Sequence, residues 1–254
     1  MTRKITHSTS LKKVSWLIIF SIAMAYLESA VVVYLREIYY PDGFSFPLSP
    51  VESGIVITEF WREVATIVML VGISIITGKS ATQRFAFFLL AFAIWDIFYY
   101  VFLYVLLGWP SSLMEWDLLF LVPIPWVGPV ITPVIVSLLM ILLAFHIIYF
   151  NKKLNRLEWV FSILGSLVVI TSWMLDYCNF SAERATNGVW TLSSKNGLFD
   201  TPQQYIPKTF NWYIFFAGTL LIALTILTYY LRNNKVYKNK LTNFSISPQE
   251  QHQK

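Results

Sequence analysis

Charged side chains are scarce in this sequence of 254 residues, at 13% of the total. Soluble globular domains carry roughly 25% charged residues, so the shortage argues against an ordinary soluble domain. Hydrophobic residues take their place: 56% of the chain is hydrophobic, 17% is aromatic, and the mean hydropathy is +0.59. This composition is typical of an integral membrane protein.

Cysteine and histidine are almost absent. Cys178 is the only cysteine, which excludes an internal disulfide, a zinc-finger motif and a cysteine-bound iron–sulfur cluster. Of the three histidines only His146 falls in a long hydrophobic stretch, so a haem held by two histidines within the membrane is excluded as well. The cofactor is therefore unknown from the sequence, and a divalent cation bound by carboxylates stays open.

Long hydrophobic runs dominate what is present. Each is close to the roughly 20 residues that a helix needs to cross the bilayer core, and none has the alternating pattern of a membrane barrel strand. We therefore expect an all-α membrane protein, a six-helix transmembrane bundle forming one polytopic domain over residues 1–235, with a disordered cytoplasmic tail at 236–254. The expected spans are residues 14–35, 54–77, 84–107, 127–150, 157–176 and 211–231.

Basic residues mark one side of the predicted membrane. Lys and Arg are frequent before the first span, after the second and fourth spans and in the C-terminal tail, whereas segments 36–53 and 108–126 hold only Arg36. Short loops rich in Lys and Arg stay in the cytoplasm, so both termini are expected there. The basic rim suits anionic lipid headgroups, so the expected partner of the basic chain is the lipid bilayer and not nucleic acid. The oligomeric state is not predicted.

Acidic residues lie within the predicted spans, where they are costly. The stretch "EFWREVATIVML" at 59–70 places two glutamates and one arginine in the outer part of the second span. An ionisable group in hydrocarbon costs about 2.5–3.5 kcal/mol on insertion scales, so these groups are expected to face an outward-facing pocket. The residues expected to line this carboxylate and aromatic pocket are Glu28, Glu59, Arg62, Glu63, Asp96, Tyr100, Asp117 and Asp176.

Two other interpretations of these charges stay open. Glu59 and Glu63 are one helical turn apart and, with Asp96, offer the oxygen ligands that Mg²⁺, Ca²⁺ or Mn²⁺ prefer. Alternatively, Arg62 neutralises one of the two glutamates, and the remaining acids tie helices together through hydrogen bonds. In that case the charges stabilise the bundle and bind no solute.

Five prolines between residues 108 and 139 exclude one straight helix there, because each interior proline removes a backbone hydrogen bond. Segment 113–126 is too short to cross the bilayer. We expect either a re-entrant piece or an aromatic interfacial loop before the fourth span. Broken backbone at membrane depth is tolerated where it lines a cavity, and Asp117 lies in this segment.

Three stretches carry a resemblance to a known group of proteins. They are "AYLESAVV" in the first span, "EFWREVAT" in the second and "WDIFYYVFLYVLLGWPSSLMEWDLLFLVPIPWVGPV" across the third span and the proline segment. Over residues 15–145 the chain resembles an uncharacterised family of bacterial multi-pass integral membrane proteins with about six spans. The resemblance implies a bacterial inner membrane, and it implies no activity and no catalytic residue.

Three classes of function are compatible with the sequence. The first hypothesis is transport of a cation or small solute, since transporters build sites from broken helices. The second is a carboxylate-metal-dependent enzyme acting on a lipid-linked substrate at the outer leaflet. The third is a non-catalytic accessory subunit of the membrane. Whether the protein is an enzyme stays open.

Overall fold

The computed structural model describes residues 2–184 and 205–246 and confirms the all-α bundle of six helices. Their bounds are α1 Thr2–Tyr39, α2 Ser53–Thr77, α3 Ala81–Leu107, α4 Ile131–Phe150, α5 Arg156–Arg184 and α6 Trp212–Ile246. Each contains a segment of 20 to 28 residues that is long and apolar enough to cross a bilayer. The chain is therefore a multi-pass membrane protein.

The ends of the helices differ from the predicted spans. α1 and α5 are longer at both ends than expected, and α4 begins four residues later because a strand occupies the preceding positions. α6 continues to Ile246, through part of the tail that we expected to be disordered from residue 236. Residues 247–254 lie outside the described part of the chain.

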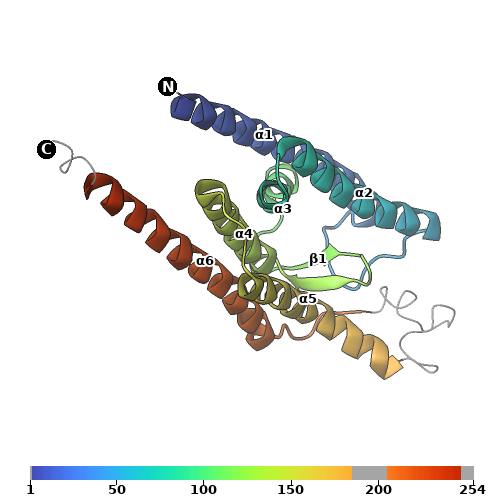
Figure 1. Ribbon diagram of the computed structural model, residues 1–254. Helices are drawn as coiled ribbons and strands as arrows, with labels where there is room; N and C mark the ends of the chain where they lie inside the picture. The colour runs from blue at the N-terminus through green and yellow to red at the C-terminus, as the bar shows by residue number, and fades with distance from the viewer. Residues whose placement is uncertain (1, 185–204, 247–254) are drawn as a thin grey trace, which may run out of the picture.

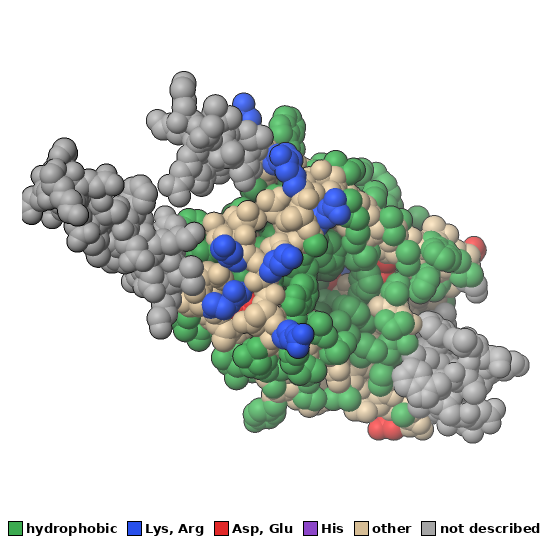
Figure 2. All heavy atoms as spheres, in the orientation of Figure 1, with side chains coloured by type: hydrophobic (Ala, Val, Ile, Leu, Met, Phe, Trp, Pro, Cys, Tyr) green, Lys and Arg blue, Asp and Glu red, His purple; other side chains and the backbone are tan. Residues whose placement is uncertain are grey.

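The helices form two sides joined through the middle of the bundle. α3 packs against α1, α2 and α4, while α6 packs against α4 and, most extensively, against α5. In Figure 1, α1 and α2 lie on one side and α5 and α6 on the other, with the start of α1 and the end of α6 toward the same end. Figure 2 shows a hollow between the two sides with mostly hydrophobic side chains around it.

Burial follows this arrangement. Half of the apolar window of α3 is buried, compared with 22% for α2, because α3 is surrounded by other helices. Large hydrophobic side chains on the outer helices are exposed, such as Ile76 at 80% and Tyr213 at 90%. Such surfaces are stable where hydrocarbon replaces water as the solvent.

Two glycines set the close approach of α5 and α6. A Cβ on Gly165 would lie 2.9 Å from the carbonyl oxygen of Gly218, and a Cβ on Gly218 would lie 2.8 Å from the backbone nitrogen of Val169. Small residues let the backbones of membrane helices approach closely, so that van der Waals packing holds them together. The sequence therefore fixes this helix pair through two residues that lack side chains.

The proline segment is a small β-hairpin, which the sequence did not predict. β1 (Trp116–Phe120) pairs antiparallel with β2 (Trp126–Pro129), and the turn between them holds two prolines, where no ladder hydrogen bond is needed. β2 is held against α5, because the ring of Trp126 stacks on that of Trp173 with centroids 5.7 Å apart. The segment expected as a re-entrant piece or an interfacial loop is therefore paired β-structure.

Basic side chains gather at the end where α1 begins and α6 ends, which we call the basic end, and acidic ones are visible toward the opposite end (Figure 2). At the basic end α5 and α6 are joined by a charged contact. Both carboxylate oxygens of the fully buried Glu158 accept hydrogen bonds from Arg232, at 2.9 and 2.8 Å. The side chain of Glu158 also accepts a hydrogen bond from the backbone nitrogen of Asn155, and the side-chain oxygen of Asn155 accepts one from the backbone nitrogen of Glu158, so the first turn of α5 has a reciprocal cap.

Candidate functional site

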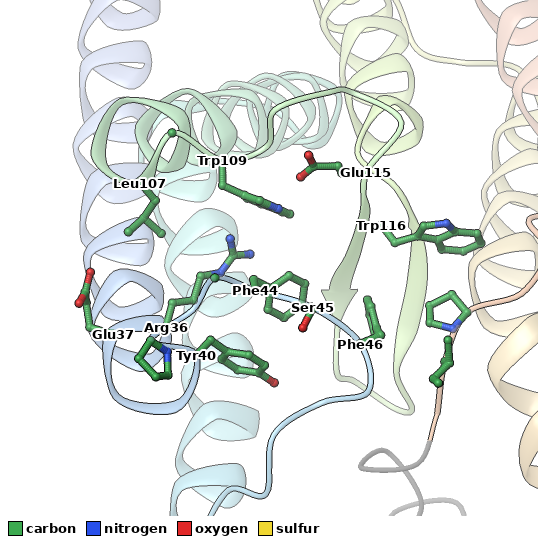
Figure 3. A pocket seen from close by; sticks show the side chains of 15 residues that line it. Arg36, Glu37, Tyr40, Phe44, Ser45, Phe46, Leu107, Trp109, Glu115 and Trp116 are labelled. Carbon is green, nitrogen blue, oxygen red and sulfur yellow. The ribbon is translucent and has the colours of Figure 1, made fainter.

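A cavity of about 660 Å³ opens at the end of the bundle opposite the basic end (Figure 3). It lies between the C-terminal end of α1, the loop that follows α1, the end of α3 and the start of the hairpin. We call it the aromatic pocket, because five aromatic side chains line it. These are Tyr40, Phe44, Phe46, Trp109 and Trp116.

The loop after α1 is anchored where it lines the pocket. The backbone nitrogen of Ser49 donates a hydrogen bond of 2.9 Å to the hydroxyl of Tyr40. Phe46 packs against Tyr205, with ring centroids 6.0 Å apart, and the hydroxyl of Tyr205 donates to Asp176 at 2.6 Å. The aromatic side of the pocket is therefore held in place by segments far apart in the sequence.

Arg36 supplies a buried cation to the pocket wall. Its side chain is 8% exposed, and the guanidinium carbon lies 3.7 Å from the ring centroid of Trp109 and 4.3 Å from that of Phe44. Aromatic faces attract cations at these distances because the ring quadrupole places negative charge on the face. Figure 3 shows the guanidinium directed toward Trp109. The two rings therefore already hold a cation, which belongs to the protein itself.

Asp117 neutralises this arginine. One carboxylate oxygen of Asp117 lies 3.4 Å from a terminal nitrogen of Arg36, and the other accepts a hydrogen bond of 3.1 Å from the hydroxyl of Tyr100. Burial raises the pKa of Asp117 to about 6, although the nearby guanidinium lowers it. The second terminal nitrogen of Arg36 is buried and makes no hydrogen bond to any described residue. The pairing of Arg36 is therefore incomplete.

Two further carboxylates belong to the pocket lining, Glu37 on α1 and Glu115 before β1. The carboxylate of Glu115 accepts hydrogen bonds from the backbone nitrogen and the hydroxyl of Ser111, and Figure 3 shows it facing Trp109. Because Asp117 balances the charge of Arg36, these two glutamates give the pocket an excess of negative charge. Aromatic faces with carboxylates form a site suited to a cationic solute.

Glu59 and Arg62 of "EFWREV" lie elsewhere and bind one another. Arg62 donates hydrogen bonds of 2.9 and 2.6 Å to Glu59 on its own helix and also pairs with Glu28 on α1. The second oxygen of Glu28 accepts a hydrogen bond of 3.1 Å from the hydroxyl of Thr66. These charged side chains are between 11% and 21% exposed. This α1–α2 charge network ties two helices together and does not line the aromatic pocket.

The remaining predicted acids each have a separate partner. Glu63 accepts a hydrogen bond of 2.8 Å from the backbone nitrogen of Leu121, and Asp96 accepts one of 2.8 Å from the hydroxyl of Ser137. Among the described residues no group of three His, Cys, Asp or Glu side chains converges as a metal site would require. The structure therefore does not bring together the three acids considered for a divalent cation, Glu59, Glu63 and Asp96.

Comparison with known proteins finds no match: no family model matches the chain, and no curated protein or solved structure is significantly similar to it. The geometry of the aromatic pocket therefore carries the functional interpretation. Of the residues predicted to line a pocket, the structure places Asp117 and Tyr100 directly behind its wall, in contact with one another. It places Glu59 and Arg62 of the second span in a separate network.

Arg36 and the aromatic lining are the functional residues that the sequence did not single out. One signal did exist, because Arg36 is the only basic residue in segments 36–53 and 108–126. An isolated arginine among acids at a helix end suggests an internal partner. No comparable signal identifies the aromatic rings, since aromatic residues make up 17% of the chain and most of them lie elsewhere.

Proposed function

We propose that the protein is a multi-pass protein of the bacterial inner membrane, with both termini in the cytoplasm, and that its aromatic pocket binds a small organic cation as the recognition step of transport. The orientation rests on the basic end, because Lys and Arg in short loops favour the cytoplasm. With that orientation the aromatic pocket opens on the outer face. Cation recognition rests on the lining of the pocket.

The observation that supports a cationic solute most strongly is the position of Arg36. The rings of Phe44 and Trp109 enclose its guanidinium at 4.3 and 3.7 Å, so this part of the lining already stabilises positive charge. The cavity of about 660 Å³ lies within the range of about 300–1,000 Å³ usual for small-molecule sites. A cation in the remaining space would be attracted by the other aromatic rings of the lining and by Glu37 and Glu115.

The arrangement of the helices supports transport. Among the described residues α1 and α2 are joined to α5 and α6 chiefly through α3 and α4, so the two sides have little direct contact with one another. Rocking of one helix group against another is a common way for transporters to alternate access. The aromatic pocket is lined by residues of α1, the end of α3, the start of the hairpin and the segment before α6, so its lining draws on both sides of the bundle.

A second candidate is the non-catalytic accessory subunit, which the α1–α2 charge network favours. The acids of that network are satisfied by Arg62 and Thr66, so they need no bound solute to explain their burial. No observation on the described residues favours the metal-dependent enzyme. The accessory role predicts that the aromatic pocket binds no small cation.

Equilibrium dialysis of the detergent-purified protein with radiolabelled tetramethylammonium tests the proposal. We expect saturable binding, weakened about 3- to 10-fold by Glu115→Gln, because the variant removes about 1 kcal/mol of attraction between a solvent-accessible ion pair. Glu52→Gln is the matched control, since Glu52 is exposed beside the start of α2 and does not line the pocket. The control variant should bind as tightly as the native protein.

Uptake of the same labelled cation into proteoliposomes separates transport from binding alone. Transport predicts uptake above that of protein-free vesicles, reduced in the Glu115→Gln variant and unchanged in the Glu52→Gln variant. Saturable binding without uptake would reject transport and leave a cation-binding accessory role. Absence of saturable binding in the native protein would reject cation recognition altogether.

A further inference from the structure

A second cavity lies at the basic end, far from the aromatic pocket. Its volume is about 320 Å³, and it is a cleft between the first residues of the α1 span and the last residues of α2. α1 and α2 make few contacts with each other along their length, so the cleft opens sideways between two helices. We call it the α1–α2 cleft.

The end of the cleft nearest the helix termini is positively charged. Lys12 is exposed, and Lys13 donates a hydrogen bond of 3.1 Å to the backbone carbonyl of Thr77, near the C-terminus of α2. A carbonyl carries no net charge, so this bond leaves the charge of Lys13 uncompensated. Among the described residues Lys12 makes no salt bridge, and no Asp or Glu lines the cleft. Two ammonium groups therefore face an opening that contains no counter-charge.

The next turn into the membrane is apolar on both helices. Trp16 and Leu17 follow the lysines on α1, and Ile73 and Ile76 precede Thr77 on α2. At 1.5 Å per residue Trp16 and Leu17 lie about one helical turn deeper than the lysines, and Ile73 lies about one turn deeper than Thr77, with Ile76 next to Thr77. Trp16 is 69% exposed and Ile76 is 80% exposed. The cleft is therefore cationic at the helix ends, where Lys12 and Lys13 lie on α1, and apolar on both walls below them.

This gradient matches one class of molecule. We propose that the α1–α2 cleft binds an anionic phospholipid, with its phosphate against Lys12 and Lys13 and an acyl chain along Trp16 and Ile76. A free anion would use only the charged level and would gain nothing from the exposed hydrocarbon below it. A phospholipid has a charged group for the lysines and a hydrocarbon chain for the apolar walls. Its headgroup would lie close to Trp16, and Trp side chains prefer the boundary between hydrocarbon and water. The site is independent of the solute proposed for the aromatic pocket.

Native mass spectrometry of the full chain, titrated with phosphatidylglycerol in detergent, tests the site. We expect the double variant Lys12→Gln/Lys13→Gln to bind the first phosphatidylglycerol about 30-fold more weakly, since each lysine near an anionic lipid contributes roughly fivefold. Lys152→Gln/Lys153→Gln is the matched control, because it removes the same charge from exposed positions at the same end. The control should change affinity by less than about twofold.

Three outcomes would overturn the proposal. Equal losses in the two double variants would mean that the basic end attracts anionic lipid without a defined site. Displacement of the lipid by 50 mM inorganic phosphate would mean that the cleft binds a free anion at its charged end. Equal binding of phosphatidylcholine would mean that the lysines do not select an anionic headgroup. If the Lys12→Gln/Lys13→Gln variant does not fold, Lys12→Gln alone decides, because this side chain is exposed and its loss should still weaken binding about fivefold.

Discussion

Removing Arg62 gives the strongest expected effect on stability, because this residue compensates two partly buried carboxylates. In Arg62→Met the acids Glu28 and Glu59 lose the guanidinium that both contact, and only Thr66 still donates to Glu28. Breaking a buried ion pair by removing one partner costs about 3–5 kcal/mol. At the 2–4 °C per kcal/mol typical of chains of this size, the unfolding midpoint should fall by roughly 6–20 °C.

Thermal unfolding of the detergent-purified variants measures this effect. The charge-balanced variant Glu28→Gln/Glu59→Gln/Arg62→Met should recover most of the loss, because it removes the uncompensated acids along with the arginine, and replacing a whole buried network by neutral groups is often nearly neutral. A midpoint in Arg62→Met within about 2 °C of the native value would refute the role of the α1–α2 charge network as a tie between helices. So would a triple variant that is less stable than the single one.

Two further predictions concern packing and pH. Gly218→Leu should prevent α5 and α6 from packing, because even its Cβ would lie 2.8 Å from a backbone nitrogen of α5. Size-exclusion chromatography of this variant should therefore show aggregation. The control variant Gly72→Leu, whose Cβ meets nothing within 4 Å, should elute as the native protein does. Burial raises the pKa of Asp117 to about 6, above the unfolded value near 3.9, so the folded state binds more protons between these values. The stability that this group contributes is then complete below about pH 4 and is lost as the pH rises to about 6. Unfolding midpoints from pH 4 to pH 7 should therefore fall less steeply in Asp117→Asn, and an unchanged slope would contradict the burial of Asp117.

The six spans could be predicted because length and hydropathy alone determine them. A helix satisfies its own backbone hydrogen bonds, so the membrane requirement acts on each segment separately. The hairpin at β1 and β2 could not be predicted in this way, since its stability depends on contacts with other segments, such as the stacking of Trp126 on Trp173. Prolines show where a helix is excluded, but they do not show what replaces it.

The charges illustrate a second limit. From the cost of burying ions we expected Glu59, Arg62 and Glu63 to face an outward-facing pocket, and this argument did not identify the partners that the structure gives them. Arg62 pairs with Glu28 on α1, whereas the next residue, Glu63, accepts a hydrogen bond from the backbone of the hairpin. These choices depend on the rotation of α2 against its neighbours, which the hydrophobic pattern leaves undetermined because most of α2 is exposed to lipid.

The aromatic pocket escaped prediction for a related reason. Its lining comes from the end of α1, the loop after it and the segment between α3 and β1, so no single stretch contains the site. Among the pocket residues only Arg36 gives a signal in the sequence, because it is the only basic residue of its segment. Its partner Asp117 was expected in a pocket, and the structure instead places that carboxylate behind the pocket wall, paired with Arg36.

One labelling experiment tests most directly the claim that an outward-facing aromatic pocket binds a small cation. With Cys178 replaced by serine, Ser45→Cys carries the only thiol in the chain, and Ser45 is exposed and lines the pocket. We predict that a membrane-impermeant maleimide labels it in intact cells and that saturating tetramethylammonium slows the labelling, whereas Lys152→Cys at the basic end is labelled only after permeabilisation. Labelling of Ser45→Cys that requires permeabilisation would contradict the orientation, and a rate unaffected by the cation would contradict binding in the pocket.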